Sequence, residues 1–164
     1  MSSDIRSMGE RRKGVQRTLA ALFCGCMAVA TSAHAATTGS VALTSDYVFR
    51  GVSQTDGKPA LQGGIEFASE GGFYAGAWGS NVSWLSDLST TAAPISSSLE
   101  LDVYGGYRGK FSDAVSYDVG LLYYAYPGDF PAGFNSADTA EVYAGLTVAA
   151  SDKLSLGAKY SHAV

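Results

Sequence analysis

The fold of this chain is decided by the stretch Leu99-Glu100-Leu101-Asp102-Val103-Tyr104-Gly105-Gly106-Tyr107-Arg108. Odd-numbered positions are apolar, small or aromatic, and most even-numbered positions are polar. A period of two predicts a β-strand with one apolar and one polar face. At ~3.3 Å per residue, ten residues extend roughly 33 Å, which suits a tilted crossing of a lipid bilayer.

The same alternation recurs along the chain, with turn-forming residues between the copies. Six further strands are predicted at about 39–51, 60–68, 73–84, 115–126, 139–149 and from 153 to the end. In the third of these, Tyr74, Trp78 and Val82 are expected on one face, opposite small residues and Asn81, and either Phe73 or Tyr74 faces outward. The sequence therefore predicts an all-β protein, an antiparallel up-and-down meander of about seven strands.

The links between these strands alternate in length. The short links are 69–72, 109–114 and 150–152, and the long links are 52–59, 85–98 and 127–137. Outer-membrane barrels combine short periplasmic turns with longer external loops. Lipid leaves unpaired backbone groups unsatisfied, so strands cross it only as a closed barrel. The alternation predicts a transmembrane β-barrel in a bacterial outer membrane.

The N-terminal segment is typical of an export signal. Basic residues between 11 and 17 precede an apolar run at 19–30, and Ala33-His34-Ala35 provides a cleavage site for signal peptidase. We therefore predict a signal peptide at 1–35 and a barrel domain at 36–164. No later segment approaches the ~18 consecutive apolar residues of a membrane-spanning helix.

Composition narrows the chemistry of the domain at 36–164. Both cysteines, Cys24 and Cys26, precede the predicted cleavage site, so this domain has no thiol for a disulfide, a zinc site or a nucleophile. Beyond residue 35 there are six basic and thirteen acidic residues, hence a formal charge of −7. This acidity argues against nucleic acid as a partner.

Two features indicate that further strands are needed for closure. Seven strands is an odd number, whereas bacterial single-chain barrels have even numbers. The last predicted strand also reaches Ala163-Val164 without a C-terminal aromatic residue. We therefore expect the chain to be truncated at its C-terminus.

Three segments carry a family resemblance. They are SDYVFRGVSQT at 45–55, KPALQGG at 58–64 and GFYAGAWGSNV at 72–82. The chain resembles the TorF porin family in these segments, and more loosely to its end. The resemblance implies an outer-membrane barrel through which small hydrophilic solutes diffuse, without catalytic residues or a cofactor. Outer-membrane lipid and the barrel-assembly machinery are then the expected partners.

Charged side chains on the polar faces are the candidate lumen-lining residues. They are Asp46, Arg50, Glu66, Glu100, Asp102, Arg108, Asp118, Glu141 and Lys159. Six acids and three bases would favour cations in an open pore. Alternatively, these charges pair and plug a non-conducting barrel that is structural or binds a ligand through external loops such as 127–134.

Other classes of protein are weaker interpretations. An outer-membrane hydrolase would need a Ser–His pair, but His162 is the sole histidine beyond residue 35 and is close to the chain end. No Asp-x-Asp-x-Asp-Gly spacing marks a calcium loop. A soluble periplasmic barrel would have to hide an unusually large apolar band. We therefore expect no enzyme, metal or cofactor.

Overall fold

A computed structural model describes residues 35–134 and 136–164, which form one antiparallel sheet with short and long connections. The sheet order is β1-β4-β5-β6-β7-β8-β9, so strands that follow one another in the sheet also follow one another in the chain. The strand bounds are β1 Ala36–Thr44, β4 Ala60–Ala68, β5 Phe73–Asn81, β6 Leu99–Lys110, β7 Val115–Ala125, β8 Thr139–Ser151 and β9 Leu154–Ala163. The predicted seven-stranded meander is confirmed.

The predicted first strand was too long. β1 ends at Thr44, and a separate two-stranded hairpin follows, formed by β2 (Val48–Phe49) and β3 (Val52–Ser53). Arg50 and Gly51 both have positive φ, 49° and 86°, so the chain reverses direction there. Positive φ at both central residues is the geometry that tight hairpins favour, which explains why the strand alternation cannot run to residue 51.

The sheet is open in the described residues. β1 and β9 form its two edges and do not pair with each other, so the seven strands are not closed into a barrel. Among the described residues, no helix is long and apolar enough to span a membrane. The predicted signal peptide, apart from Ala35, lies outside the described residues.

The exposure of the two faces of the sheet is the inverse of that in a globular protein, in which the apolar face is buried. One face presents large apolar side chains to the surroundings, and the opposite face carries the charged and tyrosine side chains. Exposed members of the first face include Val41, Leu43, Leu61, Ile65, Phe67, Phe73, Val103, Val119, Leu121, Leu146, Leu156 and Tyr160. The second face includes buried Tyr74, Glu100, Asp102, Tyr124, Glu141 and Tyr143.

The predicted grouping of Tyr74 with Trp78 on one face of β5 is confirmed, and that face is the polar one. Trp78 pairs with Asp102 of β6, and Tyr74 is only 4% exposed, so both belong to the polar face. Phe73, Ala75 and Ala77 occupy the apolar face instead. Tyrosine and tryptophan carry both an apolar body and a polar group, so alternation alone did not assign their face.

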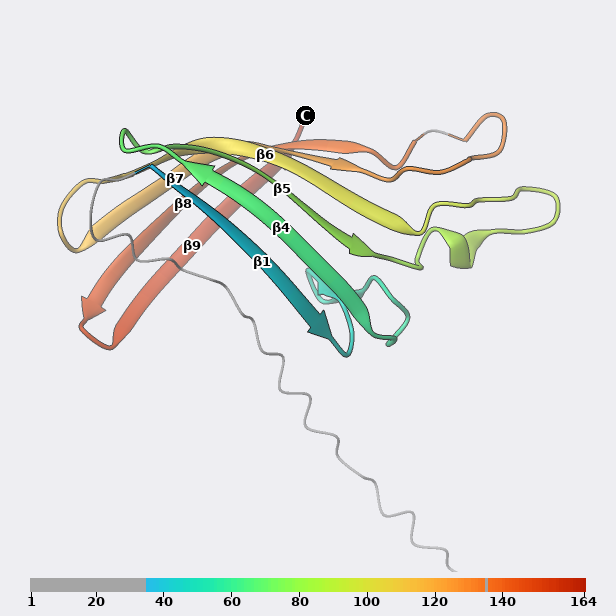
Figure 1. The fold of residues 1–164 in the computed structure, drawn as a ribbon, viewed down its shortest axis with the longest axis horizontal. Helices are drawn as coiled ribbons and strands as arrows, with labels where there is room; N and C mark the ends of the chain where they lie inside the picture. Colours follow the sequence, from blue (N-terminus) through green and yellow to red (C-terminus); the bar gives the residue numbers. More distant parts are fainter. Residues whose placement is uncertain (1–34, 135) are drawn as a thin grey trace, which may run out of the picture. The chain divides into compact units, whose positions relative to one another are not determined.

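The long connections lie at one end of the sheet and the short ones at the other (Figure 1). The long connections contact one another: the Gln54 carbonyl accepts from Ser83 N at 2.8 Å, and Asp129 N donates to Ser96 Oγ at 2.8 Å. Leu85 and Ile95, both in the β5–β6 connection, are buried there. The β5–β6 connection contains the 3-10 turn η1 (Ser86–Leu88). The predicted alternation of link lengths is confirmed.

Gly106 of β6 is predicted to be intolerant of a side chain. A Cβ there would collide with the carbonyl oxygen of Val119 and lie 2.5 Å from Tyr74 Oη. Gly106→Ala should therefore lower the free energy of unfolding by about 1–3 kcal/mol, the usual cost of overpacking.

A urea titration of the folded protein measures this loss. Gly145→Ala is the matched control, because its Cβ would meet nothing closer than 3.6 Å. The control should stay within about 0.5 kcal/mol of the parent. Equal stability of both variants would refute the tight packing of Tyr74 against β6.

Candidate functional site

The first group of charges on the polar face is centred on Arg108 of β6, and we call it the Arg108 cluster. Arg108 donates to both carboxylate oxygens of Glu66, at 2.6 and 2.9 Å, and its Nε lies 3.6 Å from Asp118 Oδ2. Its guanidinium also lies over the Tyr74 ring, 3.7 Å from the centroid. One cation thus joins carboxylates from β4 and β7, with β6 between them.

Tyrosines cross the neighbouring strands beside this cluster. The Tyr74 hydroxyl hydrogen-bonds both Asp118 and the Tyr143 hydroxyl, although Tyr74 lies on β5 and Tyr143 on β8. Gly106 and Gly120 lie under these rings, and a Cβ at Gly120 would approach Tyr143 Oη to 2.6 Å. The glycines therefore leave the space in which the tyrosines lie across the sheet.

The second group lies toward the long connections, and we call it the Arg50 cluster. Arg50 Nη1 and Nη2 each donate to Glu141 at 2.8 Å, in a two-pronged pair. Tyr124 Oη donates to the same carboxylate at 3.2 Å. The hydrogen bond to Glu141 raises the pKa of Arg50, so this guanidinium stays charged. Arg50 is 56% exposed and Glu141 is 8% exposed at the side chain, so the carboxylate is the desolvated partner.

Tyr47 precedes the β2–β3 hairpin and extends the Arg50 cluster. Its hydroxyl donates to Glu100 of β6 at 2.8 Å, and its ring meets that of Trp78 edge-on at 5.5 Å. Burial, followed by the neighbouring Glu100 charge, raises the pKa of Tyr47. The phenol therefore keeps its proton and remains a donor.

Asp102 and Lys159 are the remaining polar-face charges. Asp102 is 9% exposed, and its Oδ1 has no hydrogen-bond partner within the described chain. Lys159 Nζ lies over the Tyr143 ring at 3.7 Å. A hollow of about 580 Å³ connects these groups, lined by Phe49, Arg50, Asp102, Leu122, Tyr124, Glu141, Lys159, Tyr160 and Ser161. An unpaired carboxylate beside a hollow is suited to a hydrogen-bond donor or a cation from solution.

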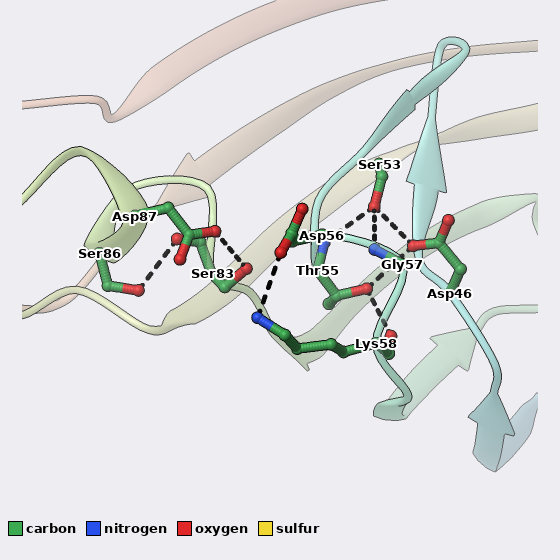
Figure 2. Close-up of polar contacts among 9 residues, drawn as sticks. All are labelled: Asp46, Ser53, Thr55, Asp56, Gly57, Lys58, Ser83, Ser86 and Asp87. Carbon is green, nitrogen blue, oxygen red and sulfur yellow. Dashed lines mark hydrogen bonds and ion pairs between the residues drawn. The ribbon is translucent and has the colours of Figure 1, made fainter.

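Asp46 does not join the polar face. Its Oδ1 accepts from Ser53 Oγ at 2.6 Å and from Thr55 Oγ1 at 3.0 Å, as Figure 2 shows. Lys58 pairs nearby with Asp56 at 3.2 Å. Asp46 therefore holds the base of the β2–β3 hairpin, and its place in a lumen stays a prediction. In the described part of the chain, no three His, Cys, Asp or Glu side chains are grouped to hold a metal ion.

The structure brings most of the predicted charges together. Seven lie on the polar face of the strands, namely Glu66, Glu100, Asp102, Arg108, Asp118, Glu141 and Lys159. Arg50 reaches the same face from the hairpin. The sequence reasoning missed the roles of Tyr47, Tyr74 and Tyr124, which connect the carboxylates. For Tyr74 and Tyr124 the signal was a tyrosine paired with a glycine or an acid on the neighbouring strand, Gly106 and Asp102 respectively.

Fold and site together define an all-β protein whose seven-stranded antiparallel sheet carries a paired polar face and an exposed apolar face. The chain belongs to a family described as bacterial protein of unknown function (Gcw_chp), whose model matches residues 27–164. No curated protein and no solved structure matches the chain.

Arg108 is predicted to stabilise the fold through its cluster. Arg108→Gln leaves Glu66 and Asp118 without their cation. It should lower the free energy of unfolding by about 1–2 kcal/mol, a value between those of exposed and of buried ion pairs. Arg108 is 45% exposed, so water screens part of the loss.

Chemical denaturation of the two charge-matched variants measures this effect. Lys110→Gln removes the same charge from the exposed end of the same strand and should be nearly neutral. Equal losses in both variants would mean that net charge, rather than the cluster, sets the stability.

Proposed function

We propose that the protein is an outer-membrane β-barrel that passes small hydrophilic solutes without catalysis. The observation that carries this proposal is the inverted exposure of the sheet. Large apolar side chains line the exposed face, while Glu100, Asp102, Glu141 and three tyrosines lie buried on the other. Lipid outside and water inside is the environment that this arrangement suits.

The energetic cost of that exposure in water is large. Burying one Val, Leu, Ile or Phe side chain is worth roughly 1.5–3 kcal/mol. Leu121, Val103 and Ile65 are each more than half exposed, at 62%, 60% and 56%, and none lies at a strand end. An apolar band over successive strands is rare on soluble monomers and marks a membrane or partner surface.

The strand lengths and connections favour a membrane over a partner surface. β6, β7 and β8 contain 12, 11 and 13 residues, enough for a tilted crossing at about 9–11 residues. Long connections at one end and short ones at the other match external loops and periplasmic turns. The sheet edges require pairing in lipid, so the proposal includes closure into a barrel. The resemblance to the TorF porin family points to the same function.

The polar face would favour cations as solutes. Arg50 is paired with Glu141, and Arg108 with Glu66 and Asp118. Glu100 is bonded to the neutral Tyr47, and Asp102 Oδ1 has no partner in the described chain. Neither acid has a paired base in the described part of the chain, and each adds negative potential to the pathway when it is ionised.

A non-conducting barrel is the second candidate. Ion pairs and crossing tyrosines occupy much of the polar face, and small barrels fill their interiors with side chains. Such a barrel would be structural or would bind a ligand. The conductance experiment below separates the two candidates.

The apolar face is predicted to contact lipid. Leu121 lies in the middle of β7, opposite Gly105 and Val142. Leu121→Lys should destabilise the protein in lipid vesicles by about 2–4 kcal/mol, the cost of a cation at mid-bilayer. Urea titration in vesicles, followed by tryptophan fluorescence, measures this loss.

The control for this prediction is Leu88→Lys. Leu88 is equally exposed, at 60%, but lies in the long β5–β6 connection. It should change stability by less than about 0.5 kcal/mol. If both lysines were tolerated equally in vesicles, the apolar face would not meet lipid.

Conductance tests the pathway itself. The full chain, extracted in detergent from the membranes of a Gram-negative host, should give discrete current steps with a preference for cations in planar bilayers. Asp102→Asn should reduce this preference, because it replaces the ionisable carboxyl group beside the hollow with a neutral amide. Asp113→Asn, in the exposed β6–β7 turn, should leave it unchanged.

The result separates the candidate functions. Silence from a protein that remains folded would favour the non-conducting barrel. Equal selectivity of all three proteins would remove Asp102 from the pathway.

A further inference from the structure

The connection between β1 and β4 folds back onto the polar face of the sheet. Its hairpin lies across the polar face and touches four strands in succession. Tyr47 meets Trp78 of β5 and Glu100 of β6. Phe49 meets Tyr124 of β7, with ring centroids 6.0 Å apart, and Arg50 pairs with Glu141 of β8.

The order of these contacts follows the order of the sheet. β5, β6, β7 and β8 are neighbours, and residues 47, 49 and 50 reach them in the same sequence. Arg50 and Glu141 are 91 positions apart in the chain. The hairpin therefore crosses the polar face from the side of β4 to β8.

The hairpin is built to hold this position. At its base, Gln54 N donates to Tyr47 O at 2.6 Å, and Asp46 accepts from both Ser53 and Thr55. At its tip, the positive φ of Arg50 is a conformation that residues other than glycine rarely adopt. The surrounding contacts must offset that strain, and the two-pronged pair with Glu141 is the strongest of them.

We propose that the β2–β3 hairpin is an internal constriction of the solute pathway, latched by the Arg50–Glu141 pair. This inference rests on the proposed function. Phe49 and Arg50 form one side of the hollow, and Asp102, Glu141 and Lys159 form the other. The gap between hairpin and sheet sets the size of the solutes that pass, and Asp102 selects those with a cationic or hydrogen-bond-donating group.

The test compares variants of the full chain in planar bilayers and in hydrogen–deuterium exchange. Arg50→Gln leaves the Glu141 carboxylate without its cation beside Asp102, so the hairpin should leave the polar face. We expect single-channel conductance to rise by about twofold or more, since the pathway widens. Amide exchange of residues 47–54 should accelerate roughly tenfold, since opening exposes the hairpin.

Three further variants isolate the latch. Lys58→Gln removes a positive charge from the same connection, where Lys58 pairs only with exposed Asp56, and should behave as the parent. Phe49→Ala loosens the hairpin without a change in charge and should shift both readouts in the same direction as Arg50→Gln. The double variant Arg50→Glu with Glu141→Arg restores an opposite pair and should return both readouts toward the parent.

The outcomes separate this inference from the proposed function. Equal conductance of the parent, Arg50→Gln and Phe49→Ala, with faster exchange in the variants, would overturn the constriction and leave the channel intact. Unchanged exchange in Arg50→Gln would overturn the latch. Silence from every folded protein would overturn both the channel and the constriction.

Discussion

The constraint on which this structure depends is the inversion of its sheet. An ordinary globular sheet turns its apolar face to a core, but here the buried face holds Glu100, Asp102 and Glu141, and the exposed face holds leucines, valines and phenylalanines. Buried charges are tolerated only when paired or hydrogen-bonded. The ion pairs, crossing tyrosines and hairpin contacts follow from this requirement, because each satisfies polar groups that the inversion buries.

Tyrosine rings pack over glycines on the polar face of the sheet. Glycines on the polar face, including Gly106 and Gly120, leave the space in which Tyr74 and Tyr143 lie across neighbouring strands, and Tyr74 reaches Asp118 two strands away. Ordinary side chains at these positions would hold the rings away from the sheet. The network thereby joins β4, β5, β6, β7 and β8 through side chains as well as through the backbone ladder.

Most of the fold could be predicted from the local pattern of the sequence. Alternation and turn residues located the seven strands, their antiparallel order and the unequal links, because each depends on residues that are close in the sequence. The partners of Arg50 and Arg108 could not be predicted from such local patterns. Arg50–Glu141 depends on the path of a hairpin across four strands, and the sequence placed Arg50 and Glu141 only among the candidate lumen-lining charges. The outward residue of β5 stayed open between Phe73 and Tyr74 because a tyrosine ring suits either face. The first strand was predicted too long because alternation does not reveal the turn at Arg50 and Gly51.

The accessibility of spin labels at successive positions of one strand tests the central claim most directly. Spin labels placed singly at residues 115–125 of β7, in a full chain with Cys24 and Cys26 replaced by serine, report whether each position meets lipid or water in vesicles. Oxygen should relax labels at 117, 119, 121 and 123, and a water-soluble nickel chelate should relax those at 116, 118 and 120, in opposite phase. Equal access of the nickel chelate to both sets would place the apolar face in water and rule out a membrane-spanning sheet.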